Sequence, residues 1–139
     1  MINELDLAWA AGFFDGEGYI TISRRNFNGY TGHFLRVGIN HVAPEPLEKI
    51  RDMFGGSFTK TTKVSGNRKP RHQWLVNTKR AKEVLEILLP YLVNKVREAE
   101  VAIEFQSTIN PGNSGKLSPE TTVYREGMKV KLMELNANC

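Results

Sequence analysis

The segment that most constrains this chain is residues 7–18, where an expected helix ends among glycines and a strand follows at once. Acidic residues lie at the end of this helix, although a helix C-terminus normally favours cations. Gly16 and Gly18 flank Glu17, so the backbone is free to turn and to leave this carboxylate exposed. Because residues 19–27 then alternate in character, they predict a half-buried strand. The segment therefore predicts a helix-to-strand junction that presents one acidic side chain.

The same segment resembles the motif that names the LAGLIDADG homing endonucleases. Its sequence at residues 10–18 is Ala-Ala-Gly-Phe-Phe-Asp-Gly-Glu-Gly. Glu17 stands where the family has its last acid, and the other residues that fit the motif are Gly12, Asp15, Gly16 and Gly18. A helix that simply ends in a glycine C-cap is the alternative interpretation. We assign Asp15 to structure, as a residue that caps or packs at the helix end.

The expected elements run in the order helix, two strands, helix, two strands and then helices, which predicts an α+β fold. The expected strands are residues 19–27, 34–41, 57–64 and 71–78, and the expected helices are about 4–15, 44–54, 79–89, 95–107 and 118–136. Asn3 or Asp6 is the expected cap of the first helix. We predict one domain over residues 1–139, with a four-stranded antiparallel sheet and helices on one of its faces. The order αββαββα is also what the resemblance implies, as a homing-endonuclease-like fold with a DNA-binding sheet.

Charge is distributed unevenly along the chain. The net charge of +4 is by itself a weak indication of nucleic-acid binding. Residues 18–44 and 53–82, however, hold 11 of the 19 lysines and arginines and no Asp or Glu. Both stretches contain the expected strands, so we expect a basic sheet face suited to the DNA major groove rather than an ordinary solvated surface. The residues expected to contact DNA are Ser23, Arg25, Arg36, Asn40, Lys60, Thr62, Arg68, Lys69, Arg71 and His72.

The single motif has a consequence for assembly. The resemblance implies a homodimer, because family members with two motifs are longer single chains. The small residues Ala8, Ala11 and Gly12 fit a two-fold contact between motif helices, and such a dimer suits a pseudo-palindromic DNA site. The two-fold axis also brings two Glu17 carboxylates together, and like charges held close need a cation to neutralise them.

A divalent-metal site is the chemistry that these carboxylates favour. Ions shared by carboxylates and scissile phosphates activate water and stabilise the leaving oxygen in phosphodiester hydrolysis. Hard oxygen ligands suit Mg²⁺, and Mn²⁺ or Ca²⁺ are other divalent ions that can bind. The resemblance suggests the Gly16 carbonyl as a further ligand beside Glu17.

Two further residues are candidates for catalysis. Lys95 follows Pro-Tyr-Leu at residues 90–92, which looks like the family's stretch before its basic active-site residue. It would stabilise charge near the scissile phosphate, and an ordinary surface lysine is the alternative. His41 ends the second expected strand, where family members carry a polar residue near the metal, and its neighbour Asn40 competes for that role.

The sequence argues against several other classes of protein. The only cysteine is Cys139, which excludes an internal disulfide and a zinc site built on several cysteines. The three histidines lack metal-ligand spacing, and no phosphate-binding nucleotide loop is present, so we expect no small-molecule cofactor. With no signal peptide or membrane-spanning run, we expect an intracellular protein of a bacterial or phage-infected cytoplasm or of an organelle such as a chloroplast or mitochondrion.

These features together favour one function. We expect a site-specific, Mg²⁺-dependent double-strand DNA endonuclease of the homing type, which acts as a homodimer on a long pseudo-palindromic site. The alternative is a non-cleaving relative that binds DNA or RNA, such as an intron maturase or a regulator. The exposed acid favours the enzyme, because a pure binder has no need for two clustered carboxylates.

Overall fold

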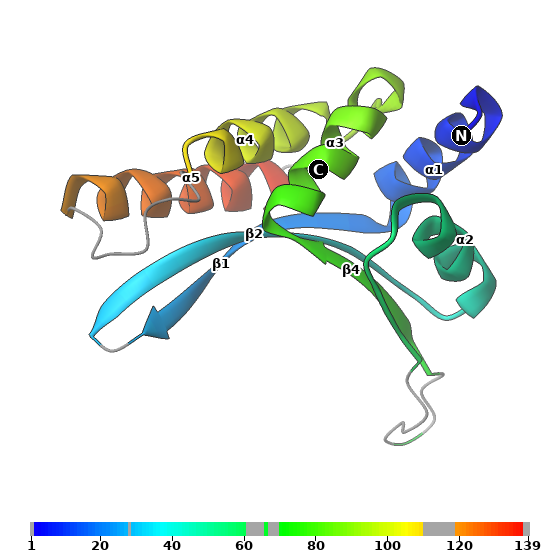
Figure 1. The fold of residues 1–139 in the computed structure, drawn as a ribbon, viewed down its shortest axis with the longest axis horizontal. Coiled ribbons are helices and arrows are strands. Elements are labelled where there is room, and N and C mark those ends of the chain that lie inside the picture. Colours follow the sequence, from blue (N-terminus) through cyan, green and yellow to red (C-terminus); the bar gives the residue numbers. More distant parts are fainter. Residues whose placement is uncertain (1, 28, 61–65, 67–69, 110–118, 138–139) are drawn as a thin grey trace.

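The chain forms a helix, two strands, a helix, two strands and then helices, in the order that the sequence predicts (Figure 1). The computed structural model describes residues 2–27, 29–60, 66, 70–109 and 119–137. In chain order the elements are α1 (Glu4–Glu17), β1 (Gly18–Phe27), β2 (Tyr30–His41), α2 (Pro44–Phe54), β3 (Ser57–Thr59), β4 (His72–Asn77), α3 (Thr78–Leu88), the 3₁₀ turn η1 (Leu89–Tyr91), α4 (Val96–Ser107) and α5 (Pro119–Ala137). Among the described residues, no helix is long and apolar enough to cross a membrane.

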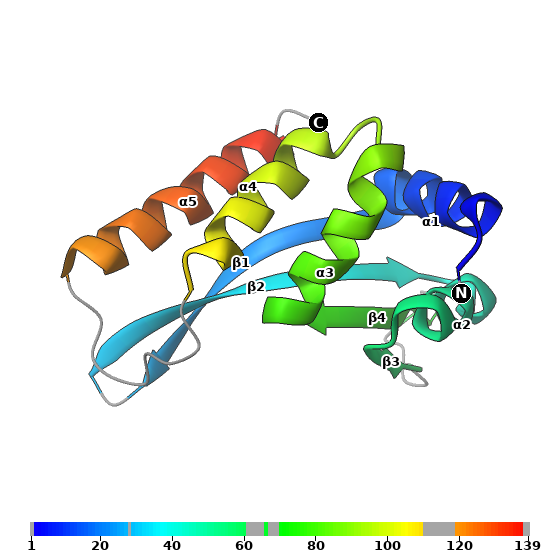
Figure 2. The same cartoon turned by 45° about the horizontal axis from the view of Figure 1, so that its top comes forward.

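The strands form one antiparallel sheet in the order β1-β2-β4-β3. The helices lie on one side of this curved sheet, and its other side carries no helix (Figure 1). Figure 2 shows α4 and α5 over the β1–β2 hairpin, α3 near the middle, and α1 and α2 at the opposite end. The predicted four-stranded antiparallel sheet with helices on one face is therefore confirmed. We call the uncovered side of the sheet the bare face.

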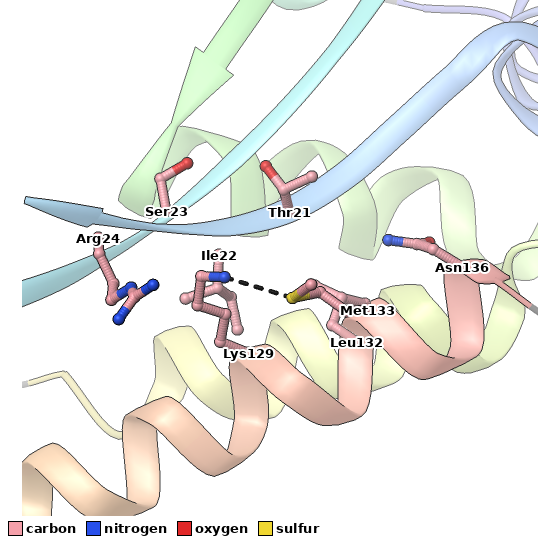
Figure 3. A pocket seen from close by; sticks show the side chains of 8 residues that line it. All are labelled: Thr21, Ile22, Ser23, Arg24, Lys129, Leu132, Met133 and Asn136. Carbon is pink, nitrogen blue, oxygen red and sulfur yellow. Dashed lines mark hydrogen bonds between the residues drawn. The ribbon is translucent and has the colours of Figure 1, made fainter.

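Alternation along the first hairpin separates the two faces. Ile20 and Ile22 pair with Val37 and Leu35, and all four side chains are buried under the helices. Figure 3 shows Thr21 and Ser23 pointing away from α5, whereas Ile22 and Arg24 point toward it, beside a hollow of about 430 Å³ between β1 and α5. The period of two read from the sequence therefore gives the correct facing of this hairpin.

The facing of the last strand is decided by its pairing with β2. Trp74 lies opposite Ile39, is almost fully buried, and donates an indole hydrogen bond of 2.8 Å to the Gly55 carbonyl. Leu75 consequently lies on the bare face, opposite Gly38. The adjacent apolar residues 74–76 do not settle this facing by themselves, because they contain no alternation.

The motif helix joins the sheet without a loop. Asn3 caps α1, as one of the two predicted caps, by accepting a hydrogen bond of 2.8 Å from the Asp6 amide. The helix continues to Glu17, two residues beyond the predicted end, and Gly18 starts β1. A side chain at Gly18 would overlap the Phe14 ring, which is buried in the core. Glycine is therefore required at this junction because the ring lies against its backbone.

Some predicted boundaries differ from the structure. β2 begins four residues before the predicted start. β3 ends at Thr59, so Lys60 lies beyond the strand, and residues 61–65 lie outside the described residues. Two of its three residues are exposed, so little burial fixes its length, whereas the first hairpin is held by a buried face.

A polar contact under the sheet attaches the last helix. The His33 side chain is buried, and its Nε2 lies 2.6 Å from Oε2 of Glu126 on α5. The other carboxylate oxygen lies 3.7 Å from the Arg24 guanidinium. The hydrogen bond with His33, and to a lesser extent the charge of Arg24, lowers the pKa of Glu126 below its ordinary value.

We predict that Glu126→Gln destabilises the fold by about 1 kcal/mol at pH 7, a few degrees in Tm, because a charge-assisted hydrogen bond is lost. The loss stays small because Glu126 is partly exposed to solvent. Because the pKa of Glu126 is lower in the folded state, its contact stabilises the fold when the pH is above the unfolded-state pKa of about 4.3. This stabilisation is lost as the pH falls through the folded-state pKa of Glu126. Thermal unfolding between pH 7 and 3 should therefore show the two proteins converging. Glu134→Gln, an exposed residue of the same helix, is the control, and an equal effect of both changes would contradict the contact.

Candidate nucleic-acid interface and active site

The bare face is polar and carries no acidic residue among its described strand positions. The register places on it Tyr19, Thr21, Ser23, Arg25, Phe34, Arg36, Gly38, Asn40, Ser57, Thr59, Gln73, Leu75 and Asn77. Hydroxyl, amide and guanidinium groups dominate this set. Such groups contact phosphates and the edges of bases in the DNA major groove.

Four of the predicted DNA contacts lie on this face: Ser23, Arg25, Arg36 and Asn40. Arg25 lies over the Phe34 ring, with 5.6 Å from its guanidinium carbon to the ring centroid. Arg36 lies in the middle strand, and its buried Nε has no hydrogen-bond partner among the described residues. Asn40 is exposed near the end of β2. These side chains present hydrogen-bond donors away from the helices.

The other predicted contacts have different placements. Lys60 and Arg71 are exposed just outside β3 and β4, whereas Thr62, Arg68 and Lys69 lie outside the described residues. His72 is buried, shares the helix side of β4 with Trp74, and has its ring centroid 6.3 Å from that of Phe58. The prediction that His72 contacts DNA is therefore corrected, because the pairing of β4 with β2 turns this side chain away from the bare face.

Glu17 lies at the junction between α1 and β1. Its side chain is exposed and makes no hydrogen bond or ion pair with the described residues. Because Gly18 pairs with Ile39, the backbone of Glu17 lies beside that of Asn40 at the end of the sheet. The junction thus places an available carboxylate at the border of the bare face.

Asp15 connects this junction to the loop before α4. Its carboxylate accepts hydrogen bonds from the backbone amides of Val93, at 2.7 Å, and Lys95, at 3.0 Å. Asn94 adds a 3.4 Å bond from its side-chain amide to the Asp15 carbonyl. Asp15 therefore has the structural role that the sequence assigned to it. These bonds also attach the backbone of Lys95 to Asp15, which precedes Glu17 by two residues in the motif helix.

His41 lies on the other side of the strand from Asn40. Its ring packs edge-on against Phe13 of α1, with ring centroids 5.3 Å apart. The His41 Nδ1 lies 3.0 Å from the Ala43 amide nitrogen, which donates to it, and 3.3 Å from the Ala43 carbonyl oxygen, so the Ala43 backbone engages this nitrogen. His41 therefore lies beside α1, and Asn40 is the residue of the pair that reaches the bare face.

One side of α1 is exposed and has small residues. Ala8 and Gly12 are exposed, as is Gly16 one turn further on, and a methyl group added at either glycine would meet nothing within 4 Å. Ala11 is fully buried in the core of the same chain, so the prediction that it contacts a partner is corrected. Spacing alone did not reveal this, because Ala11 lies about 100° around the helix from Gly12.

Oxygen donors dominate the chemistry of the junction. The described residues contain no group of three or more His, Cys, Asp or Glu that could hold a metal ion within one chain. The exposed Glu17 carboxylate and the neighbouring Gly16 carbonyl are hard oxygen donors of the kind that Mg²⁺ and Ca²⁺ prefer. These donors fit a divalent cation whose remaining ligands come from other molecules.

Comparison with known families decides the identity of the chain. The model of the LAGLIDADG endonuclease family matches residues 10–109, which contain the junction, the sheet and all of α4. This chain belongs to the LAGLIDADG endonuclease family. No curated protein matches the sequence closely enough to compare.

Solved structures share the fold of this LAGLIDADG protein. The homing endonuclease I-CvuI in complex with the I-CreI target, in the presence of 2 mM Mg, is similar with a TM-score of 0.77 and 20% identity, over 95% of this chain and 82% of that chain. The archaeal intron-encoded homing endonuclease I-Vdi141I complexed with DNA has a TM-score of 0.77 and 15% identity, over 95% and 84%. The meganuclease I-AabMI bound to uncleaved DNA has a TM-score of 0.62 and 25% identity, over 94% of this chain but 44% of that chain.

Several bare-face residues were not predicted as DNA contacts. They are Phe34, Ser57, Thr59, Gln73, Leu75 and Asn77, together with Tyr19, Thr21 and Gly38, whose outward facing the alternation already indicates. The sequence does not show which side chains of β4 face outward, because residues 74–76 are all apolar. The register between β2 and β4 would have identified Gln73, Leu75 and Asn77 as outward-facing.

We predict that Asp15→Asn lowers the free energy of unfolding by about 1–2 kcal/mol, because one carboxylate oxygen that accepts a backbone amide is replaced by a donor. Urea denaturation measures this loss, and hydrogen exchange at the Lys95 amide should be faster in the variant. Asp52→Asn is a matched control, since the exposed Asp52 side chain bonds only its neighbour Arg51. Unchanged exchange at Lys95 would show that Asp15 does not hold the loop.

Proposed function

We propose that this LAGLIDADG protein is a site-specific, divalent-metal-dependent double-strand DNA endonuclease that acts as a homodimer on a long pseudo-palindromic site. The observation that carries the proposal is the exposed Glu17 carboxylate, which has no partner among the described residues. It lies at the border of a bare sheet face that has no acidic residue among its described strand positions. A DNA backbone can approach this face without meeting a like charge until it reaches Glu17. The acid then requires a cation between itself and the phosphate.

The exposed side of α1 supports the dimer. Leu5 is 83% exposed and aligns with Ala8, Gly12 and Gly16 along one side of α1. Glycine in a helix interior costs about 1 kcal/mol relative to alanine, and no contact within the described chain requires it at Gly12 or Gly16. Close packing of a second α1 against this side would explain why glycine stands at both positions. This chain also covers less than half of I-AabMI, which is consistent with two copies forming one complete nuclease.

A two-fold axis through this contact gives the site its chemistry. It brings one Glu17 from each copy to the same place and sets the two bare faces in line along about 20 base pairs of DNA. Mg²⁺ held by Glu17 and the Gly16 carbonyl would polarise the scissile phosphate and lower the pKa of a bound water. I-CvuI structures solved with Mg and with Ca support the choice of a divalent ion.

The remaining residues of the proposed site act through charge and hydrogen bonds. Lys95, whose backbone Asp15 holds near the junction, stabilises the negative charge that develops on the phosphate. His41, whose Nδ1 is engaged by the Ala43 backbone, would use Nε2 for a hydrogen bond near the end of the sheet. Arg25, Arg36 and Asn40 contact bases or phosphates, which makes binding dependent on salt. Acting on genomic DNA, the enzyme would work in a bacterial or phage-infected cytoplasm or in an organelle.

We predict that Glu17→Gln reduces Mg²⁺-dependent cleavage at least about 100-fold while DNA binding persists, because the variant loses the charge that holds the metal. The substrate is a duplex selected from a randomised library by binding to the protein. Cleavage is followed on gels and binding by fluorescence anisotropy, with Glu4→Gln, an exposed acid at the other end of α1, as control. Specific binding of the unaltered protein without cleavage under any divalent ion would instead support the non-cleaving alternative.

We predict that Gly12→Leu converts the dimer to a monomer that keeps its fold, because the added side chain blocks close approach of a second helix but meets nothing within its own chain. Sedimentation equilibrium measures the mass, and circular dichroism the helix content. Gly127→Leu is the matched control, since Gly127 is an exposed glycine of α5 with equally open space. A dimer that survives Gly12→Leu, or one broken equally by Gly127→Leu, would place the interface elsewhere.

A further inference from the structure

A hydrogen bond crosses the bare face between two strands that are not neighbours. Gln73 on β4 donates from Nε2 to the hydroxyl oxygen of Tyr19 on β1, at 3.0 Å. β2 lies between these strands, so the bond spans its width. Both side chains are half-buried and lie on the face that we propose contacts DNA.

Gly38 makes this bridge possible. Tyr19 pairs with Gly38 in the β1–β2 register, and Leu75 pairs with Gly38 on the other side. A methyl group at position 38 would lie 2.5 Å from the Tyr19 hydroxyl oxygen and 2.7 Å from its ring carbon Cζ. The phenol therefore lies across β2 in the space that any other residue would fill. Few side-chain positions remain open to a ring held in this way, so Tyr19 is a fixed partner for Gln73.

The bond determines which groups of Gln73 are available. A carboxamide has one oxygen acceptor and two N–H donors, and Tyr19 uses one of the donors. The free oxygen and the remaining N–H lie side by side at fixed orientation. Adenine presents the complementary pair in the major groove, with the N6 amino group as donor and N7 as acceptor. Without Tyr19, the carboxamide would have to lose its freedom to rotate on binding.

We propose that Tyr19 and Gln73 form one specificity-determining unit, in which Gln73 contacts an adenine and Tyr19 is the positioning residue that sets the direction of its carboxamide. This inference rests on the proposed DNA-binding function. The unit lies toward the Glu17 end of the sheet, since Tyr19 follows Glu17 by two residues and Gln73 pairs with Asn40. The adenine is therefore in the inner part of each half-site, near the position of cleavage.

The test is a selection of binding sites from randomised duplexes by the full-length protein carrying Glu17→Gln, which binds without cutting. In this parent we expect adenine at one symmetry-related position of each half-site. Gln73→Ala should abolish the preference, a loss of about 10- to 100-fold in discrimination for a bidentate contact. Tyr19→Phe, which removes only the hydroxyl group, should weaken discrimination at the same position several-fold and leave the other positions unchanged.

Two further variants separate orientation from packing. Gln73→Glu keeps an acceptor and removes the donors, so it should shift the preference from adenine to cytosine. Gly38→Ala keeps both side chains but places a methyl group against the phenol and 2.7 Å from the Trp74 carbonyl, so it should weaken adenine discrimination at least as much as Tyr19→Phe. Thr21→Val, a neighbour on the same face and strand, is the control and should leave the adenine position unchanged.

The outcomes are distinguishable. In one outcome, the Glu17→Gln parent selects a site and its Tyr19→Phe variant keeps full adenine discrimination. This result would leave the proposed function intact and would overturn the proposed role of Tyr19 in positioning Gln73. A uniform loss of affinity at all positions in Tyr19→Phe also overturns it, because a merely structural role would weaken every contact. A parent that enriches no sequence overturns the proposed function, and this inference with it.

Discussion

The arrangement of this protein depends on the direct passage of the chain from the motif helix into the first strand. Phe14 fills the space against the Gly18 backbone, so the helix and the strand meet at one angle. Asp15, one residue later, holds the amides of Val93 and Lys95. The same junction therefore anchors the sheet, the loop before α4 and the position of Glu17. Packing of Phe14 and hydrogen bonds of Asp15 make the backbone beside Glu17 rigid, whereas the Glu17 side chain is exposed and has no hydrogen bond to the described residues. Binding sites are more precise on rigid elements of this kind.

Polar side chains on the two faces of the sheet direct their hydrogen-bonding groups to different places. Under the helices, two polar side chains join different elements: His33 contacts Glu126, and the Trp74 indole donates to the Gly55 carbonyl. On the bare face, side chains such as Arg36 and Asn40 have donors directed away from the helices. Buried polar groups need partners inside the chain, whereas a surface that binds nucleic acid gains from donors left for the ligand. The contrast between the faces agrees with membership of a DNA-cleaving family.

A single chain offers one carboxylate to the proposed chemistry. Two-metal or shared-metal hydrolysis of both DNA strands needs oxygen ligands near each scissile phosphate, and symmetry doubles what one chain supplies. The exposed glycines of α1 and the exposed Glu17 lie at the same end of the same helix. In the proposed dimer, the helix contact and the metal site would both follow from one close approach of two α1 helices, so assembly and activity would be gained or lost together.

Local sequence patterns predicted the motif junction, a cap at Asn3 or Asp6, and the facing of the first hairpin, because each follows from neighbours within a few residues. The order of these elements along the chain then predicted the helix-covered antiparallel sheet. Tertiary packing alone turned His72 toward the helices and buried Ala11. It also joined Tyr19 to Gln73, which are 54 residues apart in the chain. The apolar residues around Trp74 contain no alternation, so the facing of β4 is set by its pairing with β2. Local periodicity records which side of its own element a residue occupies, whereas contacts between distant strands decide what that side touches.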